Sequence, residues 1–181
     1  MRCTRLKFIV IGSALAMSTP VSSFQIVHEV YIGVGAMPWN YEGERDETSA
    51  TGGRLIAGTL LTDRFGIEAH FGMYGEDKVS LPAKVRIELD SLDGVFLRLN
   101  QPLFEYFNVY TLAGFSSVQM IVSPEEAGAE EDAPTASGFS LGAGAEINLG
   151  DHYAVGIDYV RYLDEPDFMF QAVTSSLKWR F

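Results

Sequence analysis

The chain has 181 residues, of which 24 are acidic and 13 are basic, so its formal net charge is −11. A chain this acidic does not bind nucleic acid, because such binding depends on basic residues that displace counterions from phosphates. The length suits one domain. The sequence contains a single cysteine, Cys3, and no motif in it indicates a cofactor.

The first 23 residues have the composition of a signal peptide. Arg2, Arg5 and Lys7 precede an apolar run over residues 8–17, which is too short to cross a bilayer as a helix of about 20 residues. Small residues then lead to Ser23. We expect a signal peptide over residues 1–23 and a mature domain over residues 24–181. Loss of Cys3 would exclude disulfides, thiolate catalysis and cysteine metal sites.

Alternating apolar and polar residues predict strands in the first half of the mature chain. We expect strands over residues 30–36, 54–61 and 67–74. A polar loop over residues 38–51 is expected to join the first two, and a tight turn over residues 62–64 to join the next two.

The same alternation continues through the middle of the chain. Residues 84–101 form one predicted strand, longer than the roughly 9–11 residues that a tilted membrane strand needs. We expect the excess to project beyond the bilayer as a hairpin that turns near residues 81–83, with residues 75–92 as the projecting segment. The alternative is a separate short amphipathic segment within a loop.

Four more strands are predicted in the second half, over residues 108–120, 139–149, 155–160 and 173–181. Neither face of the first of these is plainly polar. Tight connections are expected at residues 101–107 and 150–152, an acidic loop at 122–136 and a short loop at 164–167.

The last strand alternates to the end of the chain. Val173, Leu177, Trp179 and Phe181 lie on one face, and Lys178 and Arg180 lie on the other. This pattern is typical of a strand with one face toward lipid and one toward a polar barrel interior. The alternative is an ordinary edge strand.

Aromatic residues are predicted to gather at two levels, as in a membrane girdle. One level holds Phe65, Phe104, Tyr106, Phe107, Tyr153, Trp179 and Phe181, and the other holds Trp39, Tyr41, Tyr74, Tyr162 and Phe168. Strands cross a membrane only as a closed barrel, which satisfies every backbone group. We therefore predict an all-β fold, an eight-stranded antiparallel up-and-down transmembrane β-barrel with both termini in the periplasm and a monomeric state.

Residues 31–35 (YIGVG), 62–66 (TDRFG), 138–144 (GFSLGAG), 157–162 (IDYVRY) and 177–181 (LKWRF) resemble segments of the small eight-stranded outer-membrane proteins of Gram-negative bacteria, the opacity-protein and virulence-related group. The resemblance implies contact with outer-membrane lipid and lipopolysaccharide and a surface role, as in adhesins. It implies that Leu177, Trp179 and Phe181 form the C-terminal assembly signal for the outer-membrane insertion machinery. It also implies that the projecting segment captures an extracellular protein by strand addition.

An eight-stranded barrel leaves an interior that side chains fill, so we expect a packed polar network and no catalysis. Its predicted members are Arg54, Glu68, His70, Arg98, Asn100, Glu146, Asp158, Lys178 and Arg180. The alternative assigns Glu68 and Glu146 as a catalytic acid and base. Available arginine partners favour the structural interpretation.

Two predicted outer loops are acidic, with Glu42, Glu44, Asp46 and Glu47 in one and Glu125, Glu126, Glu130, Glu131 and Asp132 in the other. A divalent cation suits such oxygen ligands, but no calcium-loop spacing is present, and a solvated surface is favoured. Three other functions remain open: a lipid-modifying enzyme, a narrow pore, and a soluble barrel that binds a lipophilic ligand with its apolar face inward.

Overall fold

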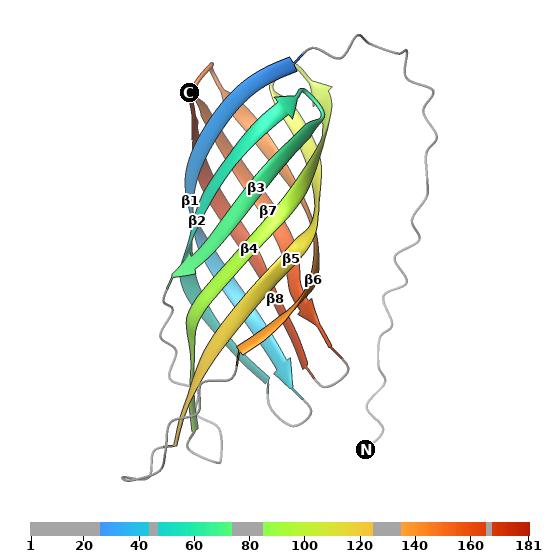
Figure 1. Cartoon of the computed structure of the whole chain (residues 1–181). Helices are drawn as coiled ribbons and strands as arrows, with labels where there is room; N and C mark the ends of the chain where they lie inside the picture. The colour runs from blue at the N-terminus through green and yellow to red at the C-terminus, as the bar shows by residue number, and fades with distance from the viewer. Residues whose placement is uncertain (1–25, 44–46, 74–84, 125–134, 166–167) are drawn as a thin grey trace, which may run out of the picture.

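The computed structural model describes residues 26–43, 47–73, 85–124, 135–165 and 168–181. Eight strands form one closed sheet in which each strand is antiparallel to its neighbours in the chain (Figure 1). The strands are β1 (Ile26–Gly43), β2 (Glu47–Thr62), β3 (Phe65–Met73), β4 (Val85–Phe104), β5 (Phe107–Pro124), β6 (Thr135–Leu149), β7 (Tyr153–Asp164) and β8 (Phe168–Arg180). Pairing of β1 with β8, as between Ile32 and Trp179, closes the barrel. The predicted fold class is therefore confirmed.

Three tight turns lie at the end of the barrel that also holds the C-terminus (Figure 1). They join β2 to β3, β4 to β5 and β6 to β7. In the last of them Gly150 has a φ of 74°, a left-handed conformation that a side chain would disfavour. Short turns mark the periplasmic end in outer-membrane barrels, so we name this end the periplasmic end and the opposite one the outer end.

Two predicted loops are too long. β1 continues to Gly43 and β2 starts at Glu47, so most of the expected loop over 38–51 is strand. β5 reaches Pro124 and β6 starts at Thr135, which shortens the expected loop over 122–136. The reason is cross-strand pairing, such as Trp39 with Ala50, which holds polar and small residues in a ladder where local composition indicates a loop.

The predicted long strand in the middle of the chain is confirmed, since β4 begins at Val85. The proposed turn at residues 81–83 lies outside the described residues. No helix in the described ranges is long and apolar enough to span a bilayer.

The outer surface of the barrel is apolar. Alternate residues of each strand point outward, among them Val34, Val95, Leu97, Ile157 and Leu177, and each of these is about half exposed. Six of the seven residues predicted for the girdle at the periplasmic end are exposed, namely Phe65, Phe104, Tyr106, Tyr153, Trp179 and Phe181, and Phe107 is half-buried.

The predicted girdle at the outer end is wrong. Trp39 and Tyr162 are buried inside the barrel, and Tyr41 and Phe168 pack against the apolar cluster there. Trp39 shares its strand parity with inward Tyr31, and Tyr162 shares its strand parity with inward Asp158 and Val160. Tyr74 lies outside the described residues. Phe115 and Phe139 are exposed on the outward face, with their ring centroids 5.7 Å apart.

Candidate functional site

The periplasmic half of the barrel interior contains an ionic network centred on Glu68 of β3. Glu68 is fully buried. Its Oε2 accepts hydrogen bonds from Tyr31 Oη at 2.6 Å, Arg98 Nη1 at 2.7 Å and Lys178 Nζ at 3.2 Å. Its Oε1 lies 2.7 Å from His70 Nε2. Four strands therefore converge on one carboxylate.

A second carboxylate links this centre to the periplasmic rim. Glu146 of β6 lies 2.8 Å from Arg98 Nη2 and 3.4 Å from Lys178 Nζ. Its Oε1 accepts a hydrogen bond from Arg180 Nη2 at 2.7 Å. Arg180 Nε in turn lies 3.2 Å from Glu29 of β1. The chain of charges thus runs from the middle of the barrel to its periplasmic rim.

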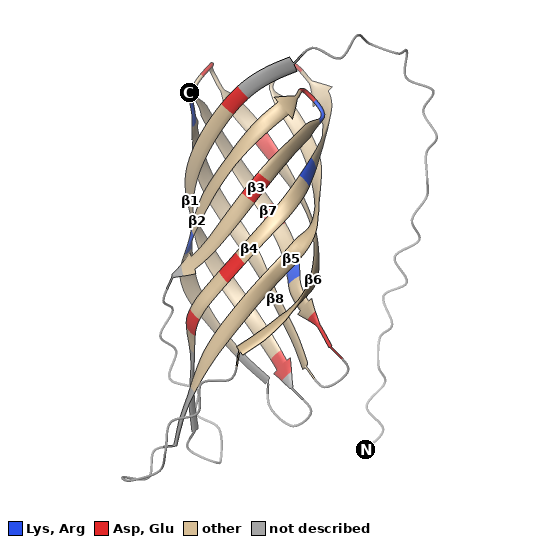
Figure 2. Cartoon of the chain, in the orientation of Figure 1, with Lys and Arg blue, Asp and Glu red and all other residues tan. Residues whose placement is uncertain are grey.

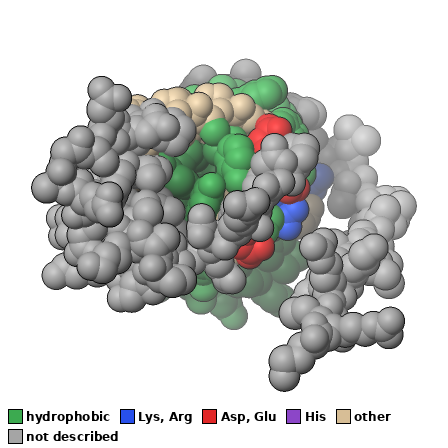
Figure 3. Space-filling view, turned by 90° about the horizontal axis from the view of Figure 1, so that it is seen from below, with side chains coloured by type: hydrophobic (Ala, Val, Ile, Leu, Met, Phe, Trp, Pro, Cys, Tyr) green, Lys and Arg blue, Asp and Glu red, His purple; other side chains and the backbone are tan. Residues whose placement is uncertain are grey.

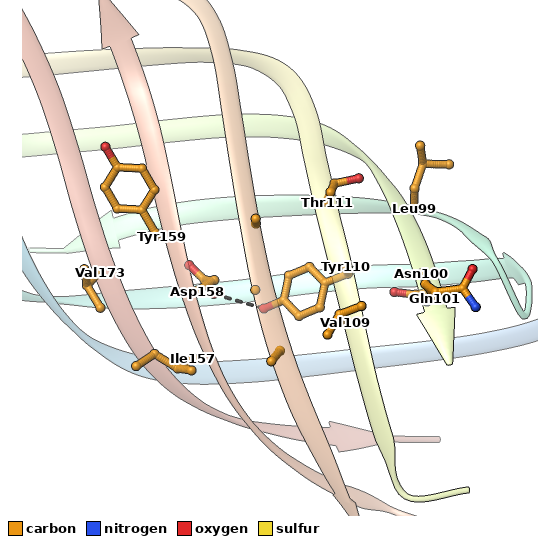
Figure 4. A pocket seen from close by; sticks show the side chains of 13 residues that line it. Leu99, Asn100, Gln101, Val109, Tyr110, Thr111, Ile157, Asp158, Tyr159 and Val173 are labelled. Carbon is orange, nitrogen blue, oxygen red and sulfur yellow. Dashed lines mark hydrogen bonds between the residues drawn. The ribbon is translucent and has the colours of Figure 1, made fainter. Parts of the chain in front are cut away.

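A third carboxylate, that of Asp158, adds Arg54 and Tyr110 to the network. Asp158 Oδ2 accepts hydrogen bonds from Arg54 Nη2 at 2.5 Å and from Tyr110 Oη at 3.2 Å, the contact drawn in Figure 4. Arg54 Nη1 also donates to Tyr162 Oη at 2.8 Å, and this hydroxyl lies 3.1 Å from His70 Nδ1. His70 therefore joins the Asp158 and Glu68 parts into one network.

Charge is balanced within the network. Among the described residues, three fully buried carboxylates (Glu68, Glu146 and Asp158) face three fully buried cations (Arg54, Arg98 and Lys178). Arg98 also places its guanidinium carbon 3.8 Å from the ring centroid of Tyr110. Pairing on this scale offsets the desolvation of each charge, which alone would be strongly unfavourable.

Seven of the nine predicted members of the interior network lie together in this cluster: Arg54, Glu68, His70, Arg98, Glu146, Asp158 and Lys178. Asn100 joins it by accepting from Arg98 Nε at 2.7 Å, and Arg180 joins at the rim.

Sequence reasoning missed Tyr31, Tyr110 and Tyr162, which carry the network between its charges. Glycines opposite two of them were the available signal. A Cβ on Gly58 would overlap the ring of Tyr31, and a Cβ on Gly144 would stand 2.5 Å from Cζ of Tyr110. Small inward residues therefore make room for the tyrosines.

The arrangement suits structural support better than acid–base chemistry. Glu68 and Glu146, the candidate acid and base, both contact Arg98 and Lys178. His70 contacts Glu68 through Nε2, and its other ring nitrogen, Nδ1, contacts the hydroxyl of Tyr162. The buried serines Ser116 and Ser140 instead donate to the carbonyl oxygen of Tyr162, at 2.8 and 2.7 Å. Among the described residues, no cluster of His, Cys, Asp and Glu has the arrangement of a metal site.

The outer half of the interior is apolar, which corrects the expectation of a polar interior throughout. Its buried side chains include Met37, Trp39, Leu89, Leu92, Phe96, Leu112, Val118, Met120, Leu163 and Phe170. Seen from the outer end, hydrophobic side chains line the opening between the grey segments (Figure 3). The interior of the barrel is therefore polar in its periplasmic half and apolar in its outer half.

The lipid-facing surface carries a shallow groove of about 730 Å³ across strands β4 to β8 (Figure 4). Leu99, Ile157, Tyr159 and Val173 line it with exposed side chains, and Ala143 with its small one leaves the hollow. A groove with this lining fits the outer surface of a barrel that lies in hydrocarbon.

An apolar exterior, an ion-paired interior and a closed sheet define the class of protein: a transmembrane β-barrel. A sequence profile of the outer membrane protein beta-barrel domain matches residues 9–181. The chain belongs to this family and is a protein of the outer membrane.

Three solved structures show the same fold. The attachment invasion locus protein Ail of Yersinia pestis, in complex with the heparin analogue sucrose octasulfate, is 14% identical with a TM-score of 0.66, covering 85% of this chain and 99% of that one. Neisserial surface protein A is 12% identical with a TM-score of 0.67, covering 84% and 97%. OprG of Pseudomonas aeruginosa is 10% identical with a TM-score of 0.65, covering 87% and 98%. No curated protein sequence gives a significant match.

Proposed function

We propose that the protein is a non-catalytic, structural and surface-interaction component of the outer membrane that binds an extracellular protein in the manner of an adhesin. The observation that carries this proposal is a two-stranded ribbon at the outer end of β4 and β5. Pairing of β3 with β4 ends at Leu92, and pairing of β5 with β6 ends at Gln119. Beyond these points Val85–Leu89 pairs with Met120–Pro124, and the ribbon extends past the end of β3 (Figure 1).

The ribbon suits strand addition because both of its backbone edges lack a strand partner within the described residues. An exposed strand edge offers unpaired amide and carbonyl groups to another extended chain. A β-bulge between Leu89 and Ser91 lies at the base of the ribbon, where it sets the direction in which the ribbon leaves the barrel wall.

The charge of the chain narrows the partner. Ail was crystallised with a polyanion, whereas this chain has a net charge of −11 and carries Glu42, Asp164 and Glu165 at the outer ends of its strands (Figure 2). Like charges would repel a sulfated polysaccharide. A protein with a neutral or basic surface is the better partner.

Deletion of the ribbon tests the proposal. The variant lacks residues 76–89 and 120–133, each gap joined by Gly-Ser, and the matched control replaces only residues 125–134 by a linker of equal length. Cells that carry the intact or control protein should adhere several-fold more to fibronectin, laminin or epithelial monolayers than cells with the ribbon deletion. Equal adhesion, with the deletion variant present in the outer membrane, would refute the proposed role.

Two rival functions have separate tests. The filled interior, with Arg54, Arg98 and Tyr162 fully buried, supports the absence of a pore, so we expect no steady single-channel conductance in planar bilayers. An enzyme acting on lipid would change the mass of lipid A in producing cells, and we expect no change.

Export and assembly complete the proposal. We propose that residues 1–23 are cleaved, so the mature chain should begin at Phe24 and its measured mass should equal that of residues 24–181. We further propose that the protein is a monomer in contact with lipid and lipopolysaccharide, and that Leu177, Trp179 and Phe181 are recognised by the insertion machinery.

A further inference from the structure

We propose that the outer mouth of the barrel is a binding site for a small cationic amphiphile, a molecule with one aromatic ring or short aliphatic group beside an ammonium or guanidinium. The site is a cavity of about 130 Å³ lined by Tyr41, Val118, Met120, Ala136, Leu163 and Phe168. This small-molecule site is independent of the adhesive role proposed for the ribbon.

The side chains that line the cavity differ in burial. Val118, Met120 and Leu163 are buried, and Tyr41, Ala136 and Phe168 are half-buried. The six side chains come from five strands, β1, β5, β6, β7 and β8, and meet across the lumen. On the side toward the periplasm, the cavity ends at the buried apolar cluster that fills the outer half of the barrel interior. A ligand would therefore enter from the outer end and stop at this cluster.

Size and lining set the apolar part of the ligand. An apolar cavity of about 150 Å³ binds a single benzene ring, so the mouth cavity suits one ring or a short branched chain. Tyr41 and Phe168 stack with their ring centroids 6.2 Å apart and present aromatic surface. Met120 has a flexible, polarizable side chain that adapts to differently shaped apolar groups.

Charge around the mouth sets the polar part. A Cβ on Gly138 would lie 3.1 Å from Cδ2 of Leu163 and 3.4 Å from Oε1 of Glu165, which places this carboxylate beside the cavity lining. The amide of Glu165 donates to the carbonyl of Phe168 at 3.0 Å. Glu42 follows inward Tyr41 on β1, so its side chain is on the outward face, where its Oε1 accepts a hydrogen bond from Asn40 Nδ2 at 3.2 Å. Glu165 is exposed and forms no ion pair with any described residue. It attracts a cation and repels a fatty-acid carboxylate, and the aromatic faces add cation–π attraction.

Ligand-observed ¹⁹F NMR on the full mature protein in phospholipid nanodiscs tests the site, with empty nanodiscs measuring partition into lipid. The probes are 4-fluorophenethylammonium and its anionic counterpart 4-fluorophenylacetate. We expect saturable binding of the cation, roughly tenfold tighter than the anion. Glu165→Gln should bring this ratio close to one, whereas Glu42→Gln on the outward face of β1 should leave it unchanged.

Filling the cavity should remove binding. Val118→Phe fills the cavity from its buried side, and Ala136→Leu is a milder second variant in case the first fails to fold. The matched control is Val95→Phe, the same change on the outward face of β4. Loss of saturable binding in the folded cavity variants and its retention in the control support the site. Absence of saturable binding to the wild type, as when a segment of the chain itself or a partner's side chain fills the mouth, overturns the proposal, as does wild-type affinity in both cavity variants.

Discussion

Glu68 is a centre of the interior ionic network. Its two oxygens meet Tyr31, His70, Arg98 and Lys178. Without it, two buried cations would face one another with less opposing charge. Removal of one partner from a buried ion-paired cluster typically costs about 3–5 kcal/mol of stability, because the remaining charge stays desolvated.

Glu68→Gln keeps the shape of the side chain and removes its charge. We expect the free energy of unfolding, measured by urea titration in detergent micelles, to fall by about 3 kcal/mol. The control is Glu105→Gln in the exposed turn between β4 and β5, where we expect a change within about 0.5 kcal/mol. Equal stability of the two variants would show that the ionic cluster does not support the fold.

At the scale of single elements, the bulge in β7 is held by two serines. Tyr162 points into the barrel at the same parity as Val160, and the bulge turns Leu163 inward as well. The carbonyl oxygen of Tyr162 then accepts from Ser116 of β5 and Ser140 of β6. These hydroxyls, 2.6 Å apart, join three strands at the boundary between the polar and apolar halves of the interior.

The double variant Ser116→Ala with Ser140→Ala leaves that buried carbonyl without its partners. We expect it to lower the free energy of unfolding by about 1–3 kcal/mol, the usual effect of an unsatisfied buried polar group. Ser117→Ala with Ser137→Ala is the matched control, since these serines bond at 3.0 Å on the exposed side of the same two strands. A control as unstable as the test variant would contradict a specific role for the bulge.

The last strand makes a prediction about assembly. Trp179 and Phe181 stack with their centroids 5.2 Å apart on the outer surface, and the amide of Phe181 bonds to the carbonyl of Val30 at 2.9 Å. Removal of Phe181 should reduce the heat-modifiable, membrane-inserted form several-fold in cells while the precursor is still exported. The control is Val173→Ala, farther along the same outward face. Unchanged insertion would refute an assembly signal in this strand.

The sequence predicts these elements to different degrees. Period-two alternation is enough to find all eight strands, because each has one face toward lipid and one toward the interior. It fails at residues 38–51, where polar residues such as Asn40 and Ser49 pair across β1 and β2. Such pairing is a property of the neighbouring strand, which local composition does not carry.

At the scale of the whole molecule, the sequence predicts the side chains of the interior correctly only in the periplasmic half of the barrel. Charged residues at inward parity identify the network, since unpaired charges do not face lipid. The sequence does not predict the apolar outer half of the interior, because an aromatic side chain such as that of Trp39 suits a membrane girdle as well as a core. The bulge near Leu163 also shifts strand parity at a place that no sequence motif marks.

The orientation of the side chains is the central claim, and a nitroxide scan along β4 tests it most directly. The chain without residues 1–23 has no cysteine, so single cysteines can be introduced from Val95 to Leu99 and labelled. In bilayers, Val95, Leu97 and Leu99 should show high accessibility to oxygen and low accessibility to a water-soluble nickel complex, while Phe96 and Arg98 should be shielded from both. Collisions with the nickel complex at Leu97, or loss of the two-residue period, would contradict a barrel whose apolar face meets lipid.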